Sequence, residues 1–164
     1  MTLLIREILG NAEQPAFADR RRDPLAVGSE DAHRRRLRGS TAAGTSIAID
    51  LPRGSFLRQH AVLHDDGQRI IVVERTPEPA LVVRLDPSLP PEQLIEQSAR
   101  VGHWAGNQHL LVEAEGLEIH VRIATTPELM LRAAEALDLS GAEVTVAELA
   151  FALESPTSVP HAHG

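Results

Sequence analysis

The chain has 164 residues, which suffices for one ordinary domain or two small ones. It contains no Cys, so disulfides and thiolate metal sites are excluded, and imidazole and carboxylate remain as ligands, a set that suits nickel or zinc. The formal net charge is −7 and all 16 basic residues are Arg, which disfavours a nucleic-acid-binding protein because phosphate neutralisation needs a basic face.

Hydrophobic residues make up 43% of the chain, but aromatic residues only 2%, so we expect a thin core of Ala, Leu, Ile and Val. No apolar run approaches membrane-spanning length, and the N-terminus shows no signal-peptide pattern. These features predict a cytoplasmic protein that has neither a membrane nor a nucleic acid as a partner.

The first half of the chain predicts strands. Residues 1–8 are apolar enough for a first strand, whereas residues 18–38 carry two Arg triplets among Asp and Glu. We expect this stretch to be an exposed loop between strands, or else a basic patch for an acidic partner; a solvated charge run is the more common case.

Short strands separated by turns follow. Residues 46–50 alternate apolar and polar at period two, and Asp65-Asp66-Gly67 is typical of a hairpin turn between two further strands. This spacing predicts a small all-β domain over residues 1–76. His60 and His64 lie beside the hairpin turn, where incidental surface histidines are more common than metal ligands.

The periodicity changes after Thr76-Pro77-Glu78-Pro79, which is typical of a linker. A helix opened by Pro90 and Pro91 is predicted to end at Gly106-Asn107, and a second helix to begin at a capping box, Thr125-x-x-Glu128. The predicted strands are residues 80–85, 110–112, 117–123 and 143–146, with a turn at Glu115-Gly116.

The resulting order, βαββαβ, predicts a ferredoxin-like domain over residues 77–150. Residues 155–164 have too little apolar content to fold, and residues 151–164 are expected to form a flexible, His-bearing tail. The predicted fold class is therefore α+β, with an N-terminal all-β domain, a ferredoxin-like domain and a short tail.

His109 is the leading candidate metal ligand, because it is expected at the exposed start of a strand just past a helix end. A two-residue loop at Glu115-Gly116 would make His120 its diagonal neighbour on one sheet face, about 7–8 Å away. That separation suits a transfer relay or a shared dimer surface better than a single metal ion. His103 lies on the preceding helix and is expected to be packed or to support the site.

Gly106-Asn107-Gln108-His109 resembles the Gly-Asn-x-His signature of the UreE family of urease accessory proteins. A second match runs from Ile47-Ala48-Ile49-Asp50-Leu51-Pro52-Arg53-Gly54 through Leu57-Arg58 to Asp65-Asp66-Gly67, and a third is Pro160-His161-Ala162-His163. The resemblance extends from about Arg36 to the end of the sequence.

The resemblance implies a nickel metallochaperone that acts as a homodimer, with His109 at the twofold interface and His161 or His163 completing the metal site. It implies delivery of Ni(II) to a urease accessory GTPase and the urease apoprotein, with Zn(II) as an alternative cargo. His120 falls near a position where family members often carry further His. The His-rich run around that position is absent here and the tail keeps only two His, which argues against nickel storage.

The sequence shows no nucleophile–base set, phosphate loop or perturbed carboxylate pair, so an enzyme is not expected. The alternative to a nickel chaperone is a non-metal peptide-binding adaptor in which the β domain is the working part and the histidines are incidental.

Overall fold

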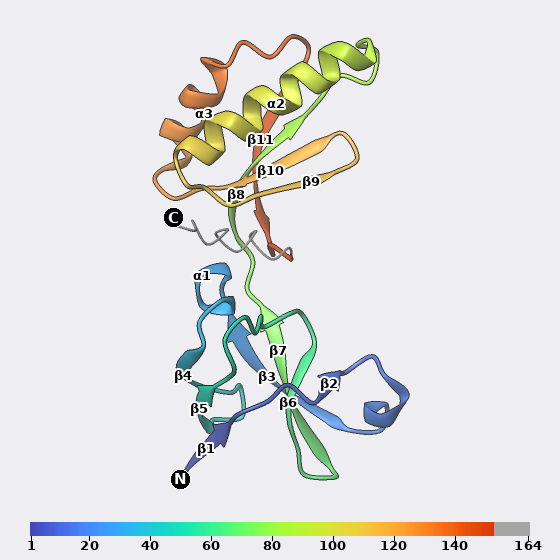
Figure 1. The fold of residues 1–164 in the computed structure, drawn as a ribbon, viewed down its shortest axis with the longest axis vertical. Coiled ribbons are helices and arrows are strands. Elements are labelled where there is room, and N and C mark those ends of the chain that lie inside the picture. Colours follow the sequence, from blue (N-terminus) through green and yellow to red (C-terminus); the bar gives the residue numbers. More distant parts are fainter. Residues whose placement is uncertain (153–164) are drawn as a thin grey trace, which may run out of the picture. The chain divides into compact units, whose positions relative to one another are not determined.

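Contacts divide the chain into two compact units, Met1–Thr76 and Pro77–Gly164. The computed structural model describes residues 1–152, which are mostly strands with three helices, so the predicted α+β class is confirmed (Figure 1). Within these residues, no helix has the combination of length and apolar composition that crossing a membrane requires.

The first unit contains a three-stranded sheet in the order β1-β5-β4. Its strands are β1 (Thr2–Ile5), which runs parallel to β5 (Ser46–Asp50), and β4 (Arg36–Ser40), which runs antiparallel to β5. Alternation of apolar and polar residues in β5 buries Ile47 and Ile49 and leaves Ser46 and Ala48 on the opposite face.

A second sheet in the same unit has the order β2-β6-β7-β3. Its strands and the two short helices near it are β2 (Gly10–Asn11), β6 (Ala61–Asp65), β7 (Arg69–Arg75), β3 (Arg21–Val27), η1 (Pro15–Phe17) and α1 (Ser29–Ala32). The β6–β7 hairpin closes at Asp65-Asp66-Gly67, as predicted, and Gly67 there has a φ of 88°.

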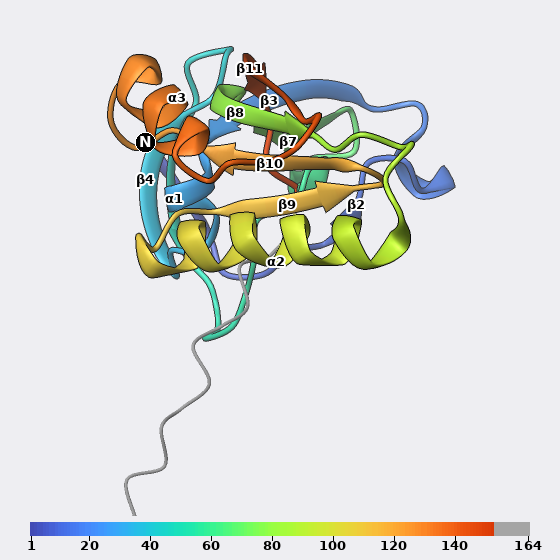
Figure 2. The same ribbon diagram turned by 90° about the horizontal axis from the view of Figure 1, so that it is seen from above.

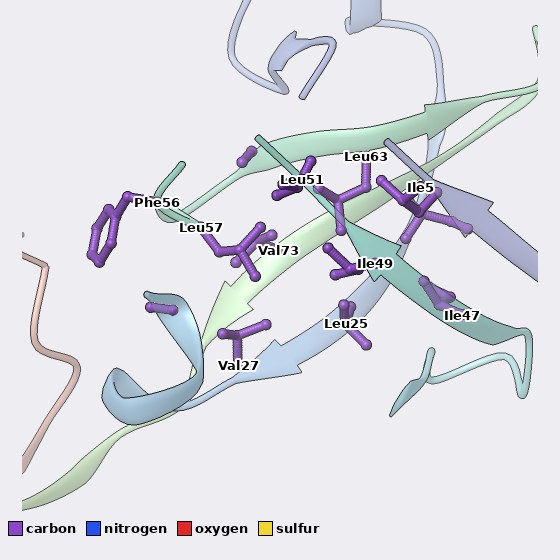
Figure 3. Close-up of a cluster of buried hydrophobic side chains, with 13 residues drawn as sticks. Ile5, Leu25, Val27, Ile47, Ile49, Leu51, Phe56, Leu57, Leu63 and Val73 are labelled. Atoms are coloured by element: carbon purple, nitrogen blue, oxygen red, sulfur yellow. The ribbon is translucent and has the colours of Figure 1, made fainter. Parts of the chain in front are cut away.

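The two sheets of the first unit enclose one apolar core (Figure 3). Leu25 and Val27 of β3 and Val73 of β7 meet Ile47 and Ile49 of β5 in this cluster. The outer face of the four-stranded sheet is also covered, by a cluster that includes Ala12 and Val62, with Phe17 packed against it. The three-stranded sheet, in contrast, packs against the core with one face only.

The prediction of an exposed loop over residues 18–38 was wrong, because this stretch contains β3, α1 and the start of β4. Asp23 occupies an inward-facing position of β3 and is only 3% exposed. Because a charged residue stands at this buried position, the sequence of β3 does not show the alternation typical of a strand. It accepts hydrogen bonds from the Thr41 hydroxyl at 2.8 Å, the Ala43 amide at 3.0 Å and Arg69 Nη1 at 3.2 Å.

The second unit is a four-stranded antiparallel sheet in the order β11-β8-β10-β9. Its elements are β8 (Glu78–Arg84), α2 (Pro91–Asn107), β9 (Val112–Glu115), β10 (Glu118–Arg122), α3 (Pro127–Glu135) and β11 (Glu143–Leu149). Both helices contribute to a single core with the strands, so both cover the same sheet face (Figures 1 and 2).

The helix starts follow from their Pro residues, although one predicted cap was wrong. Pro91 and Pro127 occupy the first positions of α2 and α3, where a missing N–H costs nothing. Because Pro127 begins α3, the capping residue is Thr126 and not Thr125, and its hydroxyl accepts a hydrogen bond from the Leu129 amide at 3.4 Å. The predicted capping box with Glu128 therefore does not form.

Candidate metal site at the end of helix α2

The end of α2 is a Schellman motif centred on His109. The Leu110 amide donates to the Ala105 carbonyl at 3.0 Å, and the His109 amide donates to the Gly106 carbonyl at 3.0 Å. His109 itself has a φ of 55°, the left-handed conformation that this motif requires. Leu110 and Ala105 both belong to the core of the second unit, so the apolar contact typical of the motif is present as well.

The helix ends at Asn107, as predicted, but its left-handed residue differs from the expectation. Gly106 and Asn107 remain in the helix, and His109, not either of these two, is the left-handed residue. Placing Leu110 against the core decides where the chain reverses, and this overrides the local preference of Gly and Asn. His109 also precedes β9, which begins at Val112, so it does not stand on a strand as expected.

The conformation of His109 is costly for a residue with a Cβ atom. A left-handed residue other than Gly costs roughly 1–2 kcal/mol, and Gly or Asn is usual at this position. His109 is exposed, so burial of its ring does not offset this cost. An energetically unfavourable residue at an exposed, hydrogen-bonded helix end is a reason to look for a functional role.

Asn107 of the same segment contacts His103, four residues earlier on α2. Asn107 Nδ2 lies 2.9 Å from His103 Nε2. Because the amide nitrogen can only donate, His103 Nε2 acts as the acceptor and its ring is held at the helix surface. His103 is exposed, so it is not packed in the core, and the expectation that it supports the site stays a prediction.

His120 lies on β10 and pairs with a different residue from the one predicted. The β9–β10 turn consists of Gly116 and Leu117, with Gly116 at a φ of 60°, so the register places Glu113 opposite His120. The predicted turn at Glu115-Gly116 was wrong by one residue. The predicted diagonal pairing with His109 is also wrong, because His109 is outside the strand.

His120 is held by its neighbours on the sheet face that points away from the two helices. Its side chain is 13% exposed, and its Nε2 lies 3.3 Å from Glu118 Oε2. Arg84 Nη2 donates a hydrogen bond to Glu118 Oε1 at 2.6 Å. This bond and the hydrogen bond with His120 hold the pKa of Glu118 below its ordinary value of 4.5. Any metal that binds His120 Nε2 has to break its direct contact with the Glu118 carboxylate.

The described residues do not assemble a complete metal site. Across residues 1–152, no three His, Asp or Glu side chains are placed to hold one ion together. His60, in the first unit, has its Nδ1 2.9 Å from a Glu13 carboxylate oxygen. His161 and His163, which were predicted as ligands, lie outside the described residues.

Comparisons with known proteins identify the family of this chain. Residues 5–75 match the family described as UreE urease accessory protein, N-terminal domain. The chain is 35% identical over 122 residues to Urease accessory protein UreE 1 of Pseudomonas syringae pv. syringae (strain B728a), covering 70% of this chain and 79% of the relative. It is 28% identical over 137 residues to Urease accessory protein UreE of Yersinia aldovae, covering 78% of this chain and 60% of the relative.

These matches define an accessory protein, not an enzyme, as expected from the sequence. The chain belongs to the UreE urease accessory protein family, which confirms the resemblance first suggested by Gly106-Asn107-Gln108-His109.

Proposed function

We propose that this protein is a metallochaperone for urease maturation, which carries Ni(II) on His109 and passes it to a urease accessory GTPase and the urease apoprotein. Membership of the UreE family supports the role in urease maturation. The observation that carries the metal assignment is the exposed, left-handed His109 at the end of α2. Zn(II) is the competing cargo, because imidazole binds both ions.

The two units have separate roles in this proposal. Residues 1–76 form the partner-binding domain, residues 77–150 the metal-binding domain, and residues 151–164 the His-bearing tail. The strand order β11-β8-β10-β9, with two helices on one face, supports a ferredoxin-like architecture for the metal-binding domain.

We further propose that two copies associate through α2. Its exposed side carries Ile95, Ala99, Gly102 and Gly106 at a spacing that puts them on one helix face. Ile95 is 70% exposed, and a Cβ atom added to Gly102 or Gly106 would meet nothing within 4 Å. Gly inside a helix costs about 0.5–1 kcal/mol relative to Ala, and packing within the described unit gives no reason for it. A second α2 helix packed closely against this face would explain why Gly stands at both positions.

A twofold axis near the end of α2 would bring two His109 imidazoles together. Two nitrogen ligands are too few for closed coordination, which agrees with the lack of a complete site among the described residues of one chain. His161 or His163 of the tails would complete the shell, and His120 would be a weaker, separate site. A site assembled from two chains and their tails suits a carrier, because its ligands can be exchanged for those of a receiving partner.

Nickel titration followed by calorimetry and by fluorescence tests this proposal. Trp104 is the only Trp and lies on α2, five residues before His109, so paramagnetic Ni(II) at His109 should quench its emission. We expect one tight nickel per dimer, with quenching, and loss of both signals in His109→Gly. Tight nickel binding that persists in His109→Gly would place the metal elsewhere and refute the assignment.

A further inference from the structure

Strand β11 forms a long, unprotected edge of the sheet in the second unit. The sheet ends with β11 on one side and with β9 on the other (Figure 2). β11 pairs with β8 in a continuous register over the seven residues Glu143–Leu149. Proteins usually protect such an edge with Pro, a basic residue, a bulge or a very short strand, because its free backbone groups otherwise pair with another chain.

The other edge strands among residues 1–152 each have one of these protections. β1, β2 and β9 are short, with four, two and four residues. β3 has seven residues but contains Pro24 and two Arg, and β4 contains two Arg and a Gly. β11 is as long as β3 and contains neither Pro, Gly nor a basic residue. Its edge is therefore the one in the described part of the chain that is best suited to pair with a further strand.

The hydrogen-bond pattern identifies the free backbone groups of β11. The amide of Leu85, directly after β8, donates to the Leu117 carbonyl at 2.9 Å, so the odd-numbered residues of β8 bond toward β10 and the even-numbered ones toward β11. The residues of β11 opposite the odd-numbered ones are Val144, Val146 and Glu148, so their N–H and C=O groups point away from β8. These groups have no backbone partner within residues 1–152.

The side chains along this edge are apolar in the middle and acidic near the ends. Val144 packs against the core that the helices cover, and Val146, on the same face, is 41% exposed. Glu148 on this face and Glu143 on the opposite face are both exposed. Residues 77–152 contain twelve Asp and Glu and four Arg, so the formal charge of this part is −8. A strand that complements this edge has an apolar middle and basic residues near its ends.

We propose that β11 pairs with an extended, basic segment of a partner protein, which adds a fifth strand to the sheet of the second unit. The segment runs antiparallel to β11 and bonds to the free backbone groups of Val144, Val146 and Glu148. Its apolar side chains cover the two Val, and its basic side chains pair with Glu143 and Glu148. This binding uses no His, so it is independent of the nickel site proposed above.

Fluorescence anisotropy on the full chain, with the dye-labelled peptide Thr-Arg-Thr-Val-Thr-Val-Arg, tests the proposal. In the antiparallel register its two Arg stand opposite Glu148 and Glu143, and its two Val stand opposite Val146 and Val144. We expect saturable binding. Methylation of the amide nitrogen of the first Val, which faces β11, should weaken binding about tenfold through the lost hydrogen bond. Methylation of the next Thr, whose amide faces away from β11, should change binding less than about twofold.

Variants of the protein test the same contacts from the other side. Val146→Pro removes an outward N–H, and Pro is tolerated where the N–H of an edge strand faces solvent, so binding should weaken about tenfold. Val146→Ala keeps this N–H and should bind within about threefold of wild type. Glu148→Arg should weaken binding about fivefold or more. Its matched control is Glu115→Arg on β9, about 14 Å away at the opposite edge, which should bind within about twofold because the distant charge is screened.

Equal binding of the two methylated peptides, or no binding of the unmethylated peptide to wild type, would overturn the proposal, whether or not Val146→Pro folds. A lower molecular mass of Val146→Pro than of wild type in light scattering would assign the edge to a second copy of the chain and would also overturn it. His109→Gly should bind the peptide as wild type does, so a failure of the nickel assignment can be distinguished from a failure of this proposal.

Discussion

The amide of Leu110 donates a hydrogen bond of 3.0 Å to the carbonyl of Ala105, and this bond forces His109, the residue before Leu110, into the left-handed region at a φ of 55°. The backbone that presents the imidazole is therefore fixed by the helix end, while the ring itself is exposed. Substitutions at His109 can separate the contribution of the ring from that of the backbone.

Replacement of His109 by Gly should stabilise the fold and abolish tight nickel binding. Gly adopts a positive φ without strain, which favours the variant by about 0.5–1 kcal/mol after allowing for its more flexible unfolded chain. Thermal unfolding of the metal-free protein and nickel calorimetry measure the two effects. His109→Ala is the comparison: it also lacks the ligand but retains the strain, so it should not be more stable than wild type. A His109→Gly variant that unfolds more readily than His109→Ala would contradict the strain argument.

Replacement of Gly102 by Arg should separate the two copies. The large cation would stand in the middle of the exposed α2 face, where two helices are proposed to approach closely. Light scattering should report a monomer, and tight nickel binding should be lost although His109 is intact, because the second imidazole is missing.

Gln93→Arg is the control for this experiment, since Gln93 is an exposed α2 residue outside the proposed interface stripe. It should remain dimeric and bind nickel normally. A Gly102→Arg variant that stays dimeric would place the interface on another surface.

Replacement of Asp23 by Ala should destabilise the first unit by about 3 kcal/mol, because it leaves the partners of a buried carboxylate unsatisfied. Asp23 joins β3 to the Thr41–Thr45 turn and to Arg69 of β7. Urea unfolding measures the loss. Asp19→Ala, at an exposed residue, should change stability by less than about 0.5 kcal/mol. Equal effects of the two substitutions would show that the buried network contributes little.

Acidification should weaken the second unit partly through Glu118. Its pKa is lowered in the folded state by Arg84, so its contribution is present above its ordinary pKa of 4.5 and is lost as the pH falls through the lower folded value. Arg84→Met should therefore make the melting temperature less sensitive to pH below about 4.5. Arg132→Met, at an exposed α3 residue, should leave the pH profile as in wild type. Identical profiles for the two variants would exclude this pairing as a source of acid sensitivity.

Local chemistry in the sequence was enough to predict many of the elements. Pro residues set the starts of α2 and α3, Asp65-Asp66-Gly67 closed a hairpin, and period-two alternation identified β5. The family resemblance was evident from three short segments, of which the stretch that ends in His109 was the first. Each of these features depends on residues close together in the chain, so a single sequence contains the required information.

Tertiary packing decided what the sequence could not. Asp is usually a surface residue, so the sequence alone does not predict that Asp23 is buried. Its hydrogen-bond donors belong to Thr41, Ala43 and Arg69, and only the fold brings them together. The end of α2 was set by Leu110 reaching the core, which moved the left-handed position from Gly106 or Asn107 to His109. Local preferences are worth about 1 kcal/mol, whereas burial of a Leu side chain is worth about 1.5–3 kcal/mol, so packing prevailed wherever the two disagreed.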